Sequence, residues 1–91
     1  MDLVFDIETD DLKATKIWCL VAQDMDSGKI YKFPPEKLSE GYEMLSNADT
    51  LIGHNIIGFD IPMVEKFGGV DLSKIPVIDT LVLSRLFNPN R

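Results

Sequence analysis

The stretch Leu3–Glu8, with the sequence LVFDIE, constrains the fold of this chain more than any other. Its apolar residues form a nearly continuous run, as in a strand buried on both faces in the middle of a sheet. Asp6 and Glu8 interrupt the run, and because side chains alternate across a strand, both carboxylates lie on the same face. Two buried carboxylates need a cation, and oxygen ligands favour Mg²⁺ or Mn²⁺. The alternative is that the strand ends early and Glu8 begins a solvated turn.

The composition of the 91 residues is that of one modest globular domain, 1–91, with 45% hydrophobic and 26% charged residues. No apolar run reaches the roughly 20 residues that cross a bilayer, so we expect no membrane association. The lone Cys19 excludes an internal disulfide and fits a reducing compartment such as the cytoplasm. A net charge of −6 disfavours a broad basic surface for nucleic acid, but not an enzyme that meets phosphodiesters through bound metal ions.

Hydrophobic periodicity and turn signals predict an α/β fold along the rest of the chain. The expected fold is a mixed sheet, with three antiparallel strands at the start, two parallel strands after them, and helices packed on the sheet. The predicted strands are 3–8, 16–24, 29–33, 50–53 and 75–78. The predicted helices are 38–46, one that follows Asp60 and stops at Gly68-Gly69, and 80–87, with 54–59 as a loop.

Three carboxylates fall at one edge of this predicted sheet. If strand 50–53 lies beside strand 3–8, then Asp60 meets Asp6 and Glu8 at the carboxyl ends of the strands, where α/β sheets place ligands. Such a set suits a two-metal site for phosphoryl transfer. The simpler interpretation is that Asp60 only caps the following helix and that His54 satisfies its ring nitrogens against backbone.

Three segments in this order resemble the 3′–5′ proofreading exonuclease domain of family A DNA polymerases, in the ribonuclease H-like superfamily. The resemblance is nearest to the replicative polymerases of short-tailed phages. Residues 4–8 (VFDIE) look like the first exonuclease motif, and 54–62 (HNIIGFDIP) look like the second. Residues 78–86 (IDTLVLSRL) are similar to the segment that enters the next helix of the phage enzymes.

The resemblance implies roles for individual residues. Asp6 would bridge two Mg²⁺ or Mn²⁺ ions, Glu8 would bind the ion that holds the attacking water, and Asp60 would bind the ion near the leaving 3′ oxygen. Asn55 would help to hold the terminal nucleotide of single-stranded DNA, with Ile7 and Thr9 lining its pocket. Asp79, which precedes Thr80 at a predicted helix start, is interpreted as a structural cap.

The third motif of that family, a Tyr three residues before a last metal-binding Asp, is absent from the sequence. We therefore expect an incomplete domain that lacks the final helices. Three interpretations follow: a part of a polymerase exonuclease that acts with its missing remainder, a non-catalytic module for binding or assembly, or a homodimer in which a second copy completes the site. The apolar residues Leu83, Leu86 and Phe87 favour self-association.

A ribonuclease H proper is the rival within the superfamily. Such an enzyme carries one carboxylate on the first strand and a Glu on the first helix, where Glu40 and Glu43 stand here. Glu8 beside Asp6 and the His54-Asn55 segment favour the exonuclease. The sequence thus predicts a fragment of the 3′–5′ exonuclease domain of a DNA polymerase, and leaves open whether the isolated chain is active.

Overall fold

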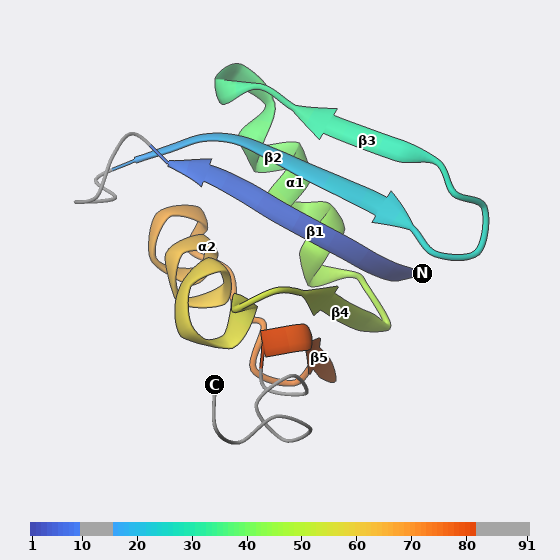
Figure 1. The fold of residues 1–91 in the computed structure, drawn as a ribbon. Coiled ribbons are helices and arrows are strands. Elements are labelled where there is room, and N and C mark those ends of the chain that lie inside the picture. The colour runs from blue at the N-terminus through green and yellow to red at the C-terminus, as the bar shows by residue number, and fades with distance from the viewer. Residues whose placement is uncertain (10–15, 82–91) are drawn as a thin grey trace.

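The computed structural model describes residues 1–9 and 16–81, and these form one mixed sheet with helices against it (Figure 1). The strands are β1 (Asp2–Thr9), β2 (Ile17–Asp24), β3 (Ile30–Phe33), β4 (Thr50–Gly53) and β5 (Val77–Asp79). The helices are α1 (Leu38–Ser46) and α2 (Ile61–Gly68), with a 3₁₀ turn η1 (Pro35–Lys37) and a π-helical turn η2 (Ile56–Asp60). No helix within the described ranges is long and apolar enough to cross a membrane.

The sheet contains the three antiparallel and two parallel strands that the sequence predicts, in the order β3-β2-β1-β4-β5. β2 pairs antiparallel with both β1 and β3. On the other side of β1, β4 pairs parallel with β1, and β5 pairs parallel with β4. The prediction that the fourth strand lies beside the first is therefore confirmed. β1 pairs with β4 only from Asp2 to Val4, so that its second half runs on beyond the end of β4.

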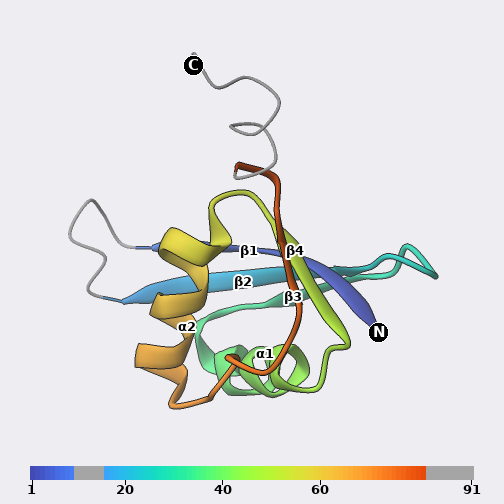
Figure 2. The same cartoon turned by 90° about the horizontal axis from the view of Figure 1, so that it is seen from below.

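Both long helices lie on the same side of the sheet, as the view from below shows (Figure 2). They cover the face of β1 that carries Leu3, Phe5 and Ile7, and these side chains are buried. Leu20 and Ala22 from β2, Tyr42 and Leu45 from α1, and Val64 from α2 complete the centre of the core. Alternation along the strands explains this arrangement, since every second residue turns toward the helices.

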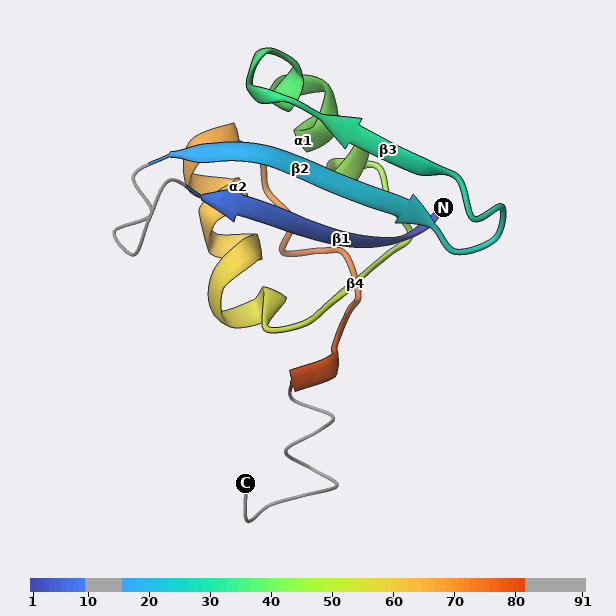
Figure 3. The same cartoon turned by 45° about the horizontal axis from the view of Figure 1, so that its top comes forward.

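The expectation that the first strand is buried on both faces is wrong for the described residues. Asp6 and Glu8 are exposed, and Val4 is only half-buried, because α1 and α2 both pack on the opposite face of β1. Figure 3 shows β1, β2 and β3 in front of the helices, with this second face open. The prediction that Asp6 and Glu8 share one face is confirmed.

Helix α1 has the predicted bounds, and Gly41 in its middle has a packing reason. A Cβ atom on Gly41 would lie 2.9 Å from two ring atoms of Phe33. The absence of a side chain therefore lets the helix approach β3 closely, which offsets the lower helix propensity of glycine.

Helix α2 ends as predicted at Gly68 and Gly69, where Gly69 adopts the left-handed conformation (φ 64°) that ends many helices. Val64 faces the core and Met63 packs against it. Phe67, in contrast, is 37% exposed. The predicted helix 80–87 enters the described residues only at Thr80 and Leu81, so that Leu83, Leu86 and Phe87 lie outside them.

Two further boundaries differ from the prediction. The last strand begins at Val77 rather than at Ile75, since Pro76 has no N–H to donate and instead accepts a hydrogen bond from the N–H of Leu51 (3.0 Å). The predicted loop 54–59 is for the most part the π-helical turn η2, which leads directly into α2. Cys19 is half-buried on β2.

Candidate functional site

Asp60 is buried at the junction of η2 and α2, with only 5% of its surface exposed. Its Oδ2 atom accepts a hydrogen bond from the backbone N–H of Ile7 over 3.3 Å. This contact is available because β1 runs beyond the end of β4, so that the second half of β1 has no β4 partner. The side chain makes no capping hydrogen bond to α2, so the interpretation of Asp60 as a helix cap is not supported.

The electrostatic environment of Asp60 disfavours its charge. Burial raises the pKa of its carboxyl to about 6, and the negative charge of Asp6 adds to that effect. The hydrogen bond from Ile7 lowers the pKa of Asp60, but by less than burial and Asp6 raise it. Within the described residues Asp60 has no ion pair with a Lys or Arg side chain. A buried carboxylate close to a second carboxylate is an arrangement that a bound cation would stabilise.

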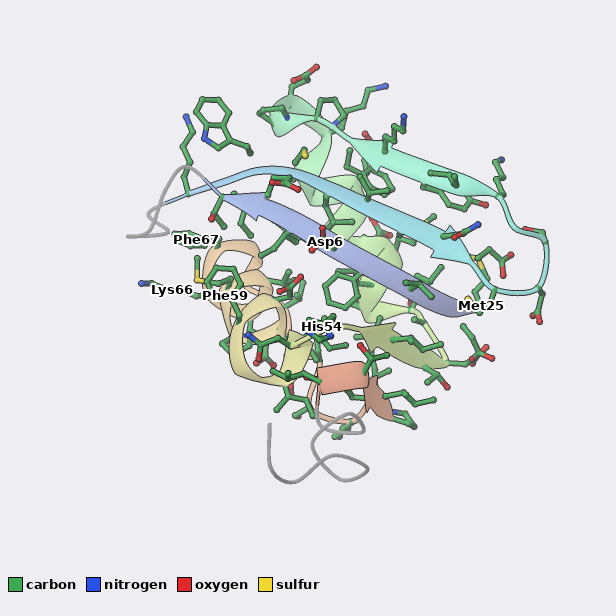
Figure 4. All side chains as sticks on the ribbon, in the orientation of Figure 1. Asp6, Met25, His54, Phe59, Lys66 and Phe67 are labelled. Carbon is green, nitrogen blue, oxygen red and sulfur yellow. The ribbon has the colours of Figure 1, made fainter. Side chains whose placement is uncertain are left out.

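Asp6 lies on the open face of β1, opposite Val21 of β2 (Figure 4). It borders a shallow apolar hollow of about 150 Å³ whose other lining residues are Val4, Phe5, Val21, Gln23 and Ile30. Glu8 lies on the same face one pleat further along, opposite Cys19, and is exposed.

The negative charge of Asp6 acts on the Asp60 carboxyl and helps to raise its pKa. No group of three or more His, Cys, Asp or Glu side chains within residues 1–9 and 16–81 is arranged closely enough to hold a metal ion. The structure therefore contains two carboxylates whose charges interact, Asp6 and Asp60, while Glu8 shares the exposed face of β1 with Asp6.

Two of the predicted substrate-binding residues, Ile7 and Thr9, lie on β1, and the third, Asn55, lies at the start of η2. The side chain of Ile7 belongs to the core, and its contribution in the structure is the N–H that binds Asp60. Thr9 is half-buried at the end of β1. Asn55 is exposed and adopts the left-handed conformation (φ 59°), and is the one described non-glycine residue with positive φ. Such backbone geometry is uncommon and often occurs at functional sites.

Asp79 has a larger structural role than the helix cap that the sequence predicts. It is 4% exposed and its carboxylate accepts hydrogen bonds from the N–H groups of Asn55 (2.8 Å), Ile57 (2.9 Å) and Leu81 (2.9 Å). The bond from Leu81 confirms the predicted cap, but the other two join Asp79 to the turn after β4. A signal was present in the sequence: an Asp at the carboxyl end of a parallel strand next to β4 is placed at the same sheet edge as Asp60.

His54 directly follows β4 and is exposed (Figure 4). Its Nδ1 atom is 2.9 Å from the hydroxyl of Thr80, and that hydroxyl also donates to the carbonyl of Gly53 (3.4 Å). His54 thus finds a side-chain partner rather than the predicted backbone partner. The turn after β4 is tied to the end of β5 through both Asp79 and Thr80.

Comparison with known proteins relates this chain to DNA polymerases. It is 32% identical to the DNA-directed DNA polymerase of Enterobacteria phage T3 over an alignment of 100 positions, which covers 97% of this chain and 14% of the polymerase. The chain therefore spans about a seventh of the length of that relative. No family model matches the sequence.

A solved structure shows the same fold. The family B DNA polymerase from the archaeon Pyrobaculum calidifontis superposes with a TM-score of 0.71 over 94% of this chain and 16% of that chain, at 19% identity. The described sheet and helices thus form a domain similar to one found in a DNA polymerase, and the chain is homologous to part of a phage DNA polymerase.

Proposed function

We propose that this chain is the metal-binding core of a 3′–5′ proofreading exonuclease domain of a DNA polymerase. The observation that carries the proposal is the buried Asp60 carboxylate, held against the backbone of β1 and repelled by Asp6. A purely structural residue at such a position would more favourably be neutral, whereas a metal ligand benefits from a site in which only a cation relieves the repulsion. The similarity to the phage polymerase supports the same reading.

The chemistry of the donor set suits Mg²⁺ or Mn²⁺, since Asp6, Glu8 and Asp60 offer only hard carboxylate oxygens. Their side chains would have to move together on binding, because they are not grouped closely enough to hold an ion in the described structure. These three residues would hold the ions, which when bound supply Lewis-acid stabilisation of the attacking and leaving oxygens of a phosphodiester. Asn55, exposed at the start of η2, would bind the 3′-terminal nucleotide of single-stranded DNA. The apolar hollow beside Asp6 is exposed on the same face of β1.

Metal binding is tested first, because it does not depend on parts of a polymerase that lie outside this chain. The free Mn²⁺ signal in electron paramagnetic resonance is titrated with the wild-type chain and with the Asp6→Asn and Asp60→Asn variants. We expect binding by the wild type and a large loss in both variants. Equal affinities in all three would overturn the proposal. Asp49→Asn, an exposed carboxylate that pairs with the N-terminus, is the matched control.

Activity is tested on a 5′-labelled single-stranded DNA oligonucleotide with Mn²⁺ or Mg²⁺. A ladder that shortens from the 3′ end, lost with chelator and reduced by roughly 100-fold or more in Asp6→Ala, supports a site that this chain completes, alone or as a homodimer. Mn²⁺ binding without cleavage supports a site that needs the remainder of a polymerase. A non-catalytic module would bind DNA equally well with and without Mn²⁺.

A further inference from the structure

The Asp79 carboxylate holds the turn between β4 and α2 from a strand that is distant in sequence. Its Oδ1 atom accepts the N–H groups of Asn55 and Leu81, and its Oδ2 atom accepts the N–H of Ile57. The side chain is almost fully buried. Hydrogen bonds from N–H groups to a carboxylate are about twice as strong as neutral ones, and their loss leaves buried donors unpaired.

The turn held in this way has an uncommon conformation, which its sequence allows through Asn55 and Gly58. Asn55 is left-handed, and a side chain at Gly58 would lie 2.8 Å from the Asn55 amide oxygen. The π-helical turn η2 starts directly after Asn55 and ends at Asp60. Because π-helical turns are rare and are strained relative to an α-helix, external contacts are needed to keep this one in place.

We propose that Asp79 is a positioning residue for the candidate site: it fixes the start of η2 and so holds Asp60 against β1 and Asn55 in its exposed, left-handed conformation. This inference rests on the proposed function for the use of the site. The N–H groups of Asn55 and Ile57 stand at the start of the turn whose last residue is Asp60, so a carboxylate that fixes the start of this five-residue turn also restricts the position of Asp60. Partners that orient a metal ligand in this way commonly change metal affinity by about 10- to 100-fold when they are removed.

Asp79→Asn is the sharpest variant, because an amide has one acceptor oxygen in place of two. Whichever way it is oriented, its NH₂ group faces an N–H donor, of Ile57 on one side or of Asn55 and Leu81 on the other. Asp71→Asn is the matched control, since Asp71 also accepts a hydrogen bond from a backbone N–H two residues on, that of Ser73 (2.9 Å), but belongs to the segment after α2.

The experiment measures two quantities on the 91-residue chain at a temperature where circular dichroism shows each variant folded. The first is amide hydrogen exchange at Asn55 and Ile57, and the second is Mn²⁺ affinity by electron paramagnetic resonance. For Asp79→Asn we expect faster exchange at both amides and an affinity about 10- to 100-fold weaker. Asp71→Asn should match the wild type in both. A role in stability alone would speed unfolding but leave the Mn²⁺ affinity of the folded variant unchanged, and that result would overturn the inference.

Thr80→Val is the second variant, for the case that Asp79→Asn does not fold. Thr80 is exposed, and its hydroxyl ties His54 and Gly53 to β5. The expected result is a smaller loss of Mn²⁺ affinity in the same direction, and an unchanged affinity contradicts the inference. If the wild type itself binds no Mn²⁺, the proposed function and the positioning role both fail, whereas unchanged exchange at Asn55 with intact Mn²⁺ binding overturns the positioning role alone.

Discussion

The Asp60 carboxylate lies 3.3 Å from the backbone nitrogen of Ile7, so that a residue from η2 occupies the place that a longer β4 would fill beside β1. The arrangement follows from the sheet register: β4 pairs with β1 only as far as Val4, and the chain then turns away at Gly53. The free half of β1 carries Asp6 on its open face. Asp60, from η2, therefore lies against the strand that carries Asp6, and the negative charge of Asp6 helps to raise the pKa of Asp60.

We expect the stability of the metal-free chain to fall as the pH rises from about 4 to about 7. The pKa of Asp60 is about 6 in the folded chain and near the ordinary aspartate value of 3.8 when the chain is unfolded. Between these values the folded state binds more protons, so the free energy of unfolding decreases with pH, by about 1–3 kcal/mol in total. Urea unfolding in the presence of chelator at several pH values measures this slope.

The control for the pH experiment is Asp60→Asn, which cannot titrate and keeps an oxygen that accepts the Ile7 N–H. Its stability should vary less over the same window. The pKa values of Asp24 and Asp71 are lowered by hydrogen bonds, and these groups act in the opposite direction only at pH values near and below 4. Equal slopes for the wild type and Asp60→Asn would show that Asp60 does not carry the effect.

Divalent metal should stabilise the wild type and not Asp60→Asn. At pH 7.5 the charged Asp60 is repelled by Asp6, so the Asn variant should be the more stable protein in chelator. A ligand at 100 times its dissociation constant adds about 2.7 kcal/mol to the free energy of unfolding, which corresponds to a Tm increase of several degrees for a domain of this size. Thermal unfolding with and without MnCl₂, at constant ionic strength, tests this order. An equal increase in both proteins would indicate Mn²⁺ binding elsewhere.

Gly41→Ala should destabilise the chain, although the same change in an open helix stabilises by about 1 kcal/mol. The added Cβ atom would lie 2.9 Å from the Phe33 ring, so that the ring or α1 has to move. We expect a loss of about 1–3 kcal/mol in urea unfolding. Ser39→Ala, at an exposed position of the same helix, should change little.

A double-mutant cycle separates the contact from other effects of Gly41→Ala. Phe33→Leu removes ring atoms from the site of the clash, so the double variant should be less destabilised than the sum of the single variants. If the changes in the free energy of unfolding add strictly, the destabilisation by Gly41→Ala does not arise from its contact with Phe33.

Local sequence patterns predicted the elements whose stabilising contacts are local. The bounds of α1 and β4 were correct because helical spacing and a short apolar run between turn residues are each complete within ten residues. The shared face of Asp6 and Glu8 was predicted by alternation alone. Which face the helices cover is decided by long-range packing, and the expectation that β1 is buried on both faces failed for that reason.

The site was predicted in part for the same physical reason. Asp60 was placed beside β1 from topology, but its hydrogen bond to Ile7 and its exposure of 5% depend on where β4 ends. The turn η2 was predicted as a loop because its conformation depends on Asp79, which is more than 20 residues away along the chain. No local pattern encodes a turn that is held by the next strand.

Gly53→Ala tests whether the site depends on the close approach of β4 to β1. A Cβ atom at Gly53 would lie 3.0 Å from the carbonyl oxygen of Phe5 and would press against the side chain of Ile56, the first residue of η2. The Phe5 carbonyl belongs to a central strand and cannot move aside, so η2 has to shift with the added methyl. We expect a loss of about 1–3 kcal/mol in urea unfolding, and weaker Mn²⁺ binding by the folded variant because Asp60 moves with η2. Ile52→Val, in the same strand, is the control and should cost about 1 kcal/mol without a change in Mn²⁺ affinity. If Gly53→Ala lowers stability but binds Mn²⁺ like the wild type, then the position of Asp60 does not depend on the end of β4, and the register argument for the site is wrong.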